Sequence, residues 1–216
     1  MDNTKKVYKL YSYWRSSSSW RLRWLLEEKE ISFETIPINL LKKEHKDAEY
    51  LKFSPNGKVP CLVDSGELSI NNSTAAALYI ESIHPTPVLL GNNAAERAKI
   101  MEAFATITED TQPIQNISVL GYISDKGVDR TEFARHWIES GLTTFMEVTK
   151  CTRGRFSFGD SLTYADMCLI PQLYNARRFD VDFSKFSVLE SIWKECESLD
   201  SYQKSRPDNQ PDAVKN

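Results

Sequence analysis

The pattern of strands and helices changes across residues 84–92, and this change constrains the fold more than any other feature of the sequence. Before it, short apolar runs alternate with helical patterns in the order strand, helix, strand, helix, strand, strand, helix. After it, residues 93–150 contain two long helical patterns and no convincing strand. Because a strand–helix–strand unit of this spacing pairs its strands in parallel, we predict an α/β domain at residues 5–87 and an all-α domain at residues 92–212.

Local signals place the elements of the first half. Strands are predicted at residues 7–11, 33–38, 59–64 and 67–71, and helices at 20–29, 44–53 and from Ser73 onward. Ser73 is expected to cap its helix. Pro37 suits an edge strand because it lacks the N–H that a second neighbour would need. Ser65-Gly66 predicts a two-residue hairpin turn between the last two strands.

The second half gives three further signals. Pro113 is expected to kink the first of its helical patterns, because proline lacks the donor of the helical hydrogen bond. Thr163 and Asp166 match a capping box at a helix start. Apolar residues at helical spacing from Leu189 to Leu199 predict a final helix, and polar residues 205–216 read as a tail over the body.

Composition excludes several classes of protein. The 216 residues are 41% hydrophobic and 26% charged, which is ordinary for one large or two small globular domains. A net charge of −3 argues against a nucleic-acid-binding protein. We see no signal peptide and no apolar run near the roughly 20 residues of a membrane span, so we expect a cytoplasmic protein without a membrane partner. The three histidines are too scattered for a metal site, and the four cysteines read as small buried hydrophobes in a reducing compartment.

A stretch rich in hydroxyls and arginines lies where the first strand gives way to the first helix, at residues 11–23. The free N–H groups and the positive end of the helix dipole favour an anion at this position. Asn72-Ser73, at a second helix start, could hold a carboxylate in the same way, and Pro60 could aim the backbone at a ligand. Taken alone, a turn with solvated arginines, a plain helix cap and an ordinary proline before a strand remain open.

Motifs spread over nearly the whole chain, residues 7–212, occur in order and at matching spacing. The sequence carries Ser16-Ser17-Ser18-Ser19-Trp20-Arg21-Leu22-Arg23, Pro37-Ile38-Asn39-Leu40, Val59-Pro60, Gln112-Pro113-Ile114-Gln115-Asn116, Gly159-Asp160, Ala165-Asp166, Asn175-Ala176-Arg177-Arg178-Phe179 and Gln210-Pro211-Asp212. With them it resembles the cytosolic glutathione transferases, and within these the zeta class or maleylacetoacetate isomerase family. It departs from the family pattern at Ser18, where the family has cysteine, and at Asn72 and His45, where it has glutamine.

The resemblance implies a thioredoxin-like N-terminal domain that binds glutathione as cofactor, an all-α domain that shapes the pocket for a small acidic substrate, and a homodimer. By position it assigns catalysis to Ser16, Ser17, Ser18 and Arg21. Substrate binding falls to Arg15 and Arg178. The implied glutathione-binding residues are Ser16, Ser17, Ser18, Ser19, Trp20, Arg21, His45, Val59, Asn72, Ser73, Gln112, Asn116, Ile117 and Ser118.

The resemblance implies glutathione-dependent isomerisation of maleylacetoacetate to fumarylacetoacetate in tyrosine and phenylalanine catabolism, with glutathione transferase activity. Two alternatives stay open: a zeta-like transferase acting on small α-halo acids without efficient isomerase activity, and a non-catalytic ligand-binding protein. Hydroxyls cannot exchange disulfides, so the sulfur must arrive with glutathione. Lowering a thiol pKa by about two units requires roughly 2.7 kcal/mol of preferential thiolate stabilisation. A hydroxyl donor, a helix N-terminus and an arginine are together suited to provide it.

Overall fold

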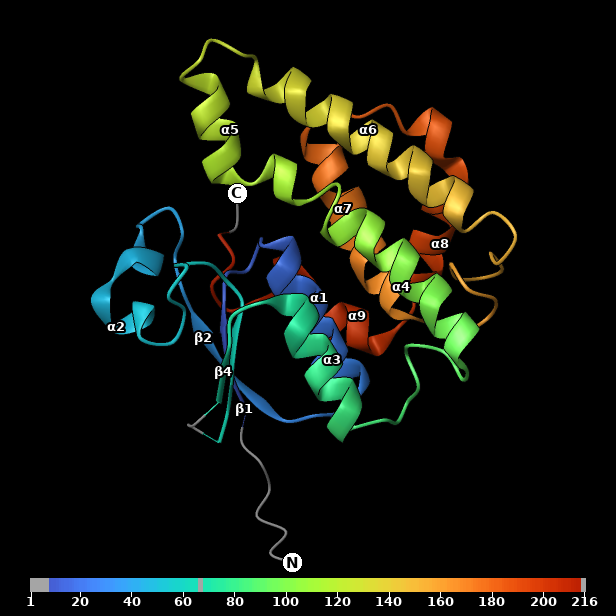
Figure 1. Ribbon diagram of the computed structural model, residues 1–216, viewed down its shortest axis with the longest axis horizontal. Helices are drawn as coiled ribbons and strands as arrows, with labels where there is room; N and C mark the ends of the chain where they lie inside the picture. The colour runs from blue at the N-terminus through green and yellow to red at the C-terminus, as the bar shows by residue number, and fades with distance from the viewer. Residues whose placement is uncertain (1–7, 66–67, 215–216) are drawn as a thin grey trace, which may run out of the picture. The chain divides into compact units, whose positions relative to one another are not determined.

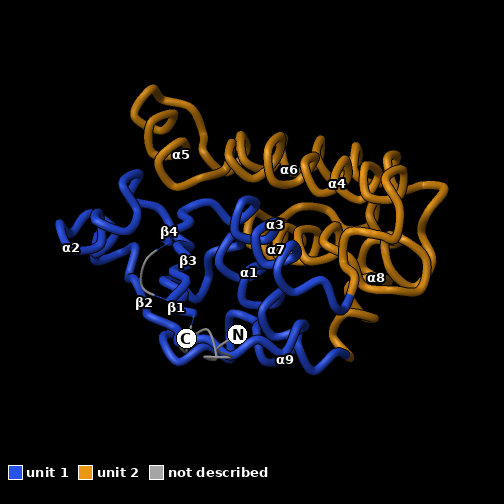
Figure 2. Tube along the Cα trace, turned by 60° about the horizontal axis from the view of Figure 1, so that its bottom comes forward, with its two compact units in different colours: residues 1–87, 199–216 blue, residues 88–198 orange. Residues whose placement is uncertain are grey.

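The computed structural model describes residues 8–65 and 68–214, which form two compact units (Figures 1 and 2). The first unit contains the residues up to Pro87 and those from Leu199 onward, and the second unit contains Val88–Ser198. The chain therefore returns to its first unit at the end, whereas the expected boundaries placed residues up to 212 in the helical domain. A mixed sheet with helices, followed by an all-helical unit, confirms the predicted fold class.

A four-stranded sheet forms the centre of the first unit, in the order β2-β1-β3-β4. Its strands are β1 (Tyr8–Ser12), β2 (Phe33–Pro37), β3 (Cys61–Asp64) and β4 (Leu68–Ile70). β1 pairs in parallel with β2, and β3 pairs antiparallel with β4, as predicted; β1 also pairs antiparallel with β3, which the sequence did not predict. Pro37 lies in the edge strand β2, where its missing N–H removes no bond to a second neighbour. Residues 7, 66 and 67, which the sequence placed in strands or the hairpin turn, lie outside the described residues.

Helices lie on both sides of this sheet (Figure 1). On one side lie α1 (Ser17–Glu28) and α3 (Ser73–Ile83), which contact each other, and on the other lie the 3₁₀ helix η1 (Glu44–Lys46) and α2 (Ala48–Leu51). The expectation that Ser73 caps α3 is wrong. Asn72 is the N-cap, because its Oδ1 accepts hydrogen bonds from the backbone N–H groups of Thr74 (2.9 Å) and Ala75 (3.0 Å).

The end of the chain is built into the first unit through α9 (Asp200–Ser205) and the 3₁₀ helix η4 (Pro207–Asn209). α9 packs against α1. The indole Nε1 of Trp20 donates to Ser205 Oγ over 3.2 Å, and that of Trp24 donates to Ser201 Oγ over 3.0 Å. The sequence treated residues from 205 as a tail and missed this packing, because serine residues that serve as buried acceptors look like surface residues in a polar segment.

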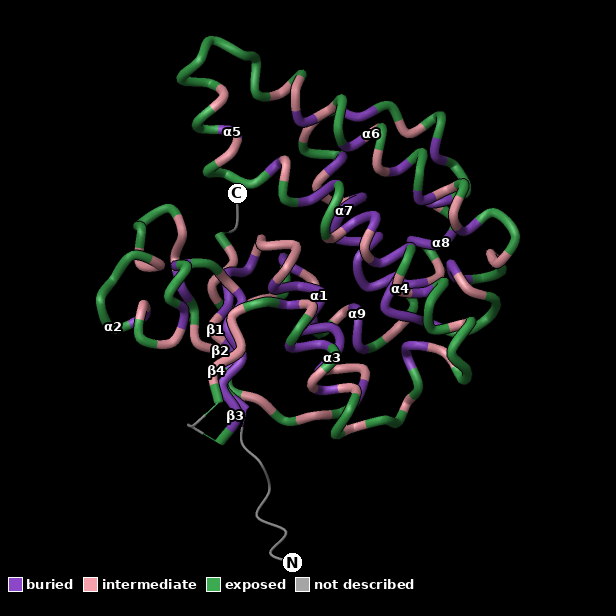
Figure 3. Tube along the Cα trace, viewed as in Figure 1, coloured by how far each residue is buried: buried purple, intermediate pink, exposed green. Residues whose placement is uncertain are grey.

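The second unit is a bundle arranged around α7 (Tyr164–Arg178), which contacts α4 (Ala94–Thr108), α6 (Arg130–Val148) and α8 (Ser187–Glu197) and is buried along most of its length (Figure 3). The sequence predicted two helical patterns in residues 93–150, and the structure has three α-helices there. Pro113 does not kink a helix: α4 has already ended, and Pro113 begins η2, where its missing N–H is not needed. The remaining elements are η2 (Pro113–Gln115), α5 (Ile117–Ser124) and η3 (Phe183–Phe186).

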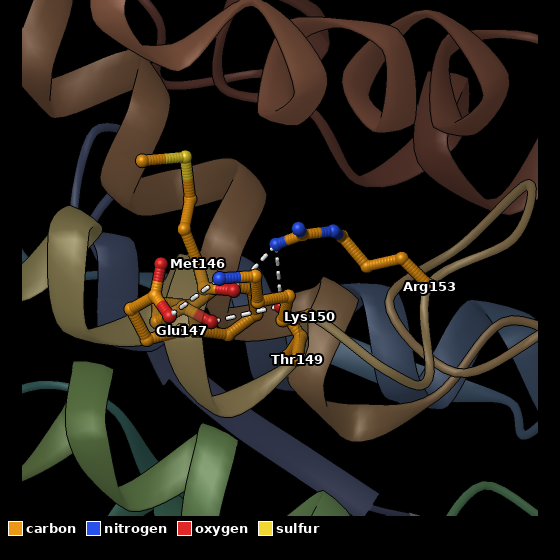
Figure 4. Close-up of polar contacts among 6 residues, drawn as sticks. Met146, Glu147, Thr149, Lys150 and Arg153 are labelled. Carbon is orange, nitrogen blue, oxygen red and sulfur yellow. Dashed lines mark hydrogen bonds and ion pairs between the residues drawn. The ribbon is translucent and has the colours of Figure 1, made fainter.

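Several helix ends in the second unit are capped by side chains, whereas α5 and α8 begin without a side-chain cap. The predicted capping box is confirmed: Asp166 Oδ2 accepts from the backbone N–H of Thr163 over 2.9 Å. At the C-terminal end of α6, Arg153 donates to the carbonyl of Met146 over 2.6 Å and to Thr149 Oγ1 over 3.2 Å (Figure 4). A cation at this position satisfies carbonyls that have no partner within the helix and complements the helix dipole.

Two further findings bear on the expectations from composition. Cys61, Cys168 and Cys196 are buried, but Cys151 is exposed, so the expectation that all four cysteines are buried is wrong for Cys151. Cys151 lies in the turn that follows α6. Over residues 8–65 and 68–214, no helix combines the length and apolarity needed to cross a membrane.

Candidate functional site

The N-terminus of α1 places hydroxyl groups where the positive end of a helix is open. Ser16 is the N-cap, with extended backbone angles, and its Oγ accepts a hydrogen bond from the backbone N–H of Ser19 over 3.3 Å. A hydroxyl that accepts in this way keeps its own proton, so Ser16 can donate to an anion in front of the helix. Ser17 and Ser18 follow in the first turn and are half-buried. The hydroxyls thus lie at a helix start, and their role toward a thiolate remains a prediction.

Arg21 connects this helix start with a second one. Its Nη2 donates to Ser18 Oγ over 2.7 Å, and its Nε donates to Ser73 Oγ over 3.0 Å. Only 6% of Arg21 is exposed, so the guanidinium is largely removed from water. Because Ser73 is the first residue of α3, one cation joins the N-termini of α1 and α3. Two anion-favouring helix ends and a shared positive charge therefore belong to one hydrogen-bonded cluster.

Arg23, the third arginine of the serine-rich stretch, has a different role. It is buried and donates to the carbonyls of Trp14 (2.9 Å) and Ser205 (3.0 Å), and to Ser12 Oγ (2.8 Å). Burial lowers its pKa to about 9, and Asp212 partly offsets this. Asp212 also accepts from the backbone N–H of Trp14 over 3.1 Å. Arg23 therefore holds the loop before α1 by hydrogen bonds from its buried guanidinium. It is a structural residue that the sequence did not distinguish from its neighbours.

Three other residues of this stretch that were predicted for the site differ in their surroundings. Ser19 and Trp20 are buried, with Ser19 Oγ accepting from the backbone N–H of Tyr13 over 3.4 Å and Trp20 bonded to α9. Their side chains hold α1 in place and do not line a surface. Arg15 is half-buried, and its guanidinium lies 5.2 Å from the ring centroid of Trp14, a cation–π contact that leaves it near the helix start.

The remaining predicted residues of the first unit lie on three different segments. His45, in η1, is half-buried, and its Nδ1 is buried without a hydrogen-bond partner among the described residues. Burial, with a smaller contribution from Lys46, lowers the pKa of His45, and Asp47 partly offsets this. Val59 precedes the cis peptide bond to Pro60 and packs against the cluster of buried residues around Cys61. The Asn72 side chain is occupied in capping α3.

Four predicted glutathione contacts lie in the second unit, at the turn that joins α4 to α5. Gln112 is buried just before η2. Asn116, Ile117 and Ser118 are exposed at the start of α5, with 69% of Ile117 in solvent. All four lie on a short segment that leads into the N-terminal end of α5. Their assignment to glutathione remains a prediction.

Arg177 and Arg178, at the end of α7, are held in different surroundings. The Arg177 guanidinium lies 3.9 Å from the ring centroid of Trp193, and its Nη2 lies 3.6 Å from Glu190 Oε1. Arg178 Nη1 instead donates to Asn175 Oδ1 over 2.9 Å and is exposed. Arg177 is thus packed against α8, whereas Arg178 is held by its own helix. The sequence alone did not distinguish these adjacent arginines.

The first unit also contains a cavity of about 270 Å³ that the sequence did not predict. Its lining combines aromatic side chains with carboxylates, namely Tyr11, Ile38, Glu44, Asp47, Glu49, Tyr50 and Phe53. Carboxylates disfavour an anionic ligand, so this cavity does not suit glutathione or an acidic substrate. Among the described residues, no group of three or more metal-ligating side chains gathers as a metal site.

Comparison with known proteins agrees with this geometry. The glutathione S-transferase N-terminal domain family matches residues 6–82. A probable maleylacetoacetate isomerase from Vibrio cholerae is 36% identical over 210 residues, which cover 94% of this chain and 97% of that protein.

Two solved structures are similar over almost the whole chain. The holo structure of maleylpyruvate isomerase, a bacterial zeta-class glutathione S-transferase, has a TM-score of 0.91 at 33% identity, covering 95% of this chain and 100% of that one. Maleylacetoacetate isomerase from Anaeromyxobacter dehalogenans, with bound GSH in the active site, has a TM-score of 0.90 at 36% identity, covering 97% and 99%. These findings confirm the resemblance found in the sequence motifs. The chain therefore belongs to the glutathione S-transferase family and, within it, to the zeta-class maleylacetoacetate isomerases.

Proposed function

We propose that this protein is a glutathione-dependent isomerase that converts maleylacetoacetate to fumarylacetoacetate, with accompanying glutathione transferase activity. The observation that carries the proposal is the hydrogen-bonded cluster in which Arg21 joins Ser18 of α1 to Ser73 of α3. Glutathione has a thiol at its centre and carboxylates at its ends. Two neighbouring helix N-termini suit these groups, one for the thiolate and one for a carboxylate.

The residues of the first unit fit glutathione in three respects. Ser16 retains a hydroxyl proton to donate to the sulfur, and Ser73, which accepts from Arg21, retains one to donate to the γ-glutamyl carboxylate. The buried Nδ1 of His45 lacks a partner among the described residues, so an N–H donor of the ligand would satisfy it. We therefore assign Ser16, His45 and Ser73, with the backbone of Val59, to glutathione binding.

Bound glutathione supplies a thiolate that adds to the cis double bond and leaves again after rotation about the resulting single bond, so it is not consumed. The protein has to keep the sulfur ionised, orient the substrate and stabilise its developing enolate. Ser16 donates a hydrogen bond to the sulfur, and Arg21 adds positive charge and fixes the orientations of the Ser18 and Ser73 hydroxyls. Ser18 need not act as a nucleophile in this scheme, so serine at the family's cysteine position is compatible with turnover.

For the acidic substrate we assign Arg178, supported by Arg15. Arg178 is exposed and hydrogen-bonded to a neutral amide, so its charge is not cancelled by that bond. Arg177, packed on an aromatic ring beside Glu190, is the less suitable of the pair. We further propose that the protein acts as a homodimer in the cytoplasm, in tyrosine and phenylalanine catabolism, with the thioredoxin-like unit as the glutathione-binding domain.

The proposal is tested with purified protein and maleylacetone, a shorter analogue of the substrate, in the presence and absence of glutathione. We expect cis–trans isomerisation that requires glutathione without consuming it. Absence of glutathione-dependent turnover would reject isomerase activity. Conversion of dichloroacetate to glyoxylate in that case would select the α-halo-acid transferase. Glutathione binding without either reaction would indicate a ligand-binding protein.

A further inference from the structure

A network of buried amide side chains in the second unit ends at Arg178. Gln115 in η2 and Gln172 in α7 are 7% and 0% exposed, and their amides face each other. Gln115 Nε2 donates to Gln172 Oε1 over 3.0 Å, and Gln172 Nε2 donates back to Gln115 Oε1 over 3.4 Å. Asn175 Nδ2 also donates to Gln115 Oε1, and Asn175 Oδ1 accepts from Arg178 Nη1 over 2.9 Å.

The network has a fixed direction because one end of it is a backbone carbonyl. Gln115 Nε2 donates to the carbonyl of Thr111 over 3.3 Å, and a carbonyl can only accept. This sets the Gln115 amide with its Nε2 toward Thr111 and its Oε1 toward Asn175. Asn175 must then present its Nδ2 to Gln115, which leaves only its Oδ1 to face Arg178. The orientation of a buried carbonyl thus determines that the guanidinium meets an acceptor.

We infer that Asn175, oriented by Gln115, is a positioning residue that holds Arg178 ready for the carboxylate of the substrate. The inference rests on the proposed role of Arg178 in substrate binding. A neutral amide is suited to this task, since it fixes the guanidinium without neutralising its charge. A long exposed side chain loses conformational freedom when it binds, and a hydrogen bond that restricts it beforehand reduces that loss. The network therefore acts on affinity for acidic substrates rather than on the chemical step.

The test compares three variants of the full-length protein with maleylacetone and with a neutral aromatic halide that glutathione conjugates. Arg178→Ala is expected to raise the KM for maleylacetone about tenfold or more, as loss of a charge-assisted hydrogen bond implies. Asn175→Leu is expected to raise it about fivefold, because the arginine remains but loses its hydrogen bond to Asn175. In both variants the KM for glutathione and the KM for the neutral halide should rise far less than the KM for maleylacetone. Arg177→Ala, one residue away and packed on Trp193, is the matched control and should leave the KM for maleylacetone unchanged.

A double variant decides whether Asn175 acts through Arg178. If it does, adding Asn175→Leu to Arg178→Ala will not raise the KM further, so the two effects will be non-additive. Asn175→Asp keeps the shape of the side chain should the leucine variant fail to fold. Its carboxylate competes with the substrate for the guanidinium, so it should raise the KM for maleylacetone at least as much.

The outcomes separate the two proposals. An unchanged KM in Arg178→Ala would overturn the substrate role of Arg178, and the positioning role with it, while leaving glutathione-dependent turnover intact. A raised KM in Arg178→Ala with no change in Asn175→Leu or Asn175→Asp would overturn the positioning role alone. Equal losses of kcat with the acidic and the neutral substrate would show that the network supports the fold and not Arg178.

Discussion

Removing the Ser16 hydroxyl is expected to raise the pKa of the glutathione thiol bound at α1. Ser16 Oγ already accepts from the backbone N–H of Ser19 over 3.3 Å, so its proton is the part that faces the ligand. A hydrogen bond to a charged group contributes about 1.5 to 3 kcal/mol, and 1.36 kcal/mol corresponds to about one pKa unit. The thiol pKa should therefore rise by about one to two units. Starting from a thiol pKa about two units below the free value of about 8.5, this lowers the thiolate fraction at neutral pH, and kcat/KM with it, about 3- to 25-fold.

Two substitutions separate this effect from the capping role of the same residue. Replacing an N-cap serine with alanine costs about 1 kcal/mol of stability, whereas glycine costs only a few tenths. Ser16→Ala and Ser16→Gly should therefore lose kcat/KM equally, while Ser16→Ala alone loses appreciable unfolding free energy. Ser18→Ala is the matched control, because it removes a hydroxyl from the same turn that is bonded to Arg21 and is not assigned to the sulfur, and it should lower kcat/KM far less.

The assay is a pH titration of thiolate absorbance in the ultraviolet with glutathione bound, combined with the pH dependence of maleylacetone turnover. Wild-type protein and the three variants are compared, and chemical denaturation supplies their unfolding free energies. An unchanged thiol pKa in Ser16→Gly would refute the assignment of Ser16 as the donor to sulfur. Equal losses in Ser16→Ala and Ser18→Ala would refute it as well.

Three further predictions concern the first unit and the exposed thiol. A thiol reagent should modify Cys151 alone of the four cysteines before unfolding, since the other three are buried and burial raises the pKa of Cys61 to about 11; rapid native-state labelling of Cys151→Ser would contradict this. Because burial and Lys46 lower the pKa of His45, the unfolded state binds this proton more readily than the folded state. The unfolding free energy should therefore fall as the pH drops below about 6.5, and His45→Gln should flatten this slope in denaturation series; an equal slope in both proteins would disprove the assignment. Arg23→Lys should lower the unfolding free energy by about 2 to 4 kcal/mol, because lysine cannot reproduce a fork that serves the buried carbonyls of the α1 loop; a loss below about 1 kcal/mol would show that the fork adds little.

The local parts of the site could be predicted from the sequence. A run of hydroxyl residues before an amphipathic segment indicates a helix start, and the structure has Ser16 there as the N-cap, although α1 begins at Ser17 and not at the predicted Trp20. The position of the second cap could not be predicted to the residue. Asn72 and Ser73 have equal preference for the N-cap, so only the observed backbone decides between them.

The long-range parts of the site could not be predicted in the same way. Arg15, Arg21 and Arg23 look alike in a hydrophilic run, yet one lies beside an indole ring, one joins two helix starts and one is buried beneath the loop. What separates them is the partner each meets far along the chain, such as Ser73 or Ser205. Neither helical periodicity nor capping preference carries information on such pairs. The motifs did mark the segments that contain Gln115 and Asn175, but not the bond between them.

The return of the chain to its first unit has a consequence for biosynthesis. Arg23, Trp20 and Trp24 find acceptors in α9, and the loop before α1 is bonded to Asp212. When residues 8–87 have been synthesised, the donors of this segment that are buried in the final structure therefore still lack these acceptors. The helical unit, Val88–Ser198, is contiguous in sequence and can fold as soon as it emerges. The half proposed to bind glutathione thus begins first and is completed last.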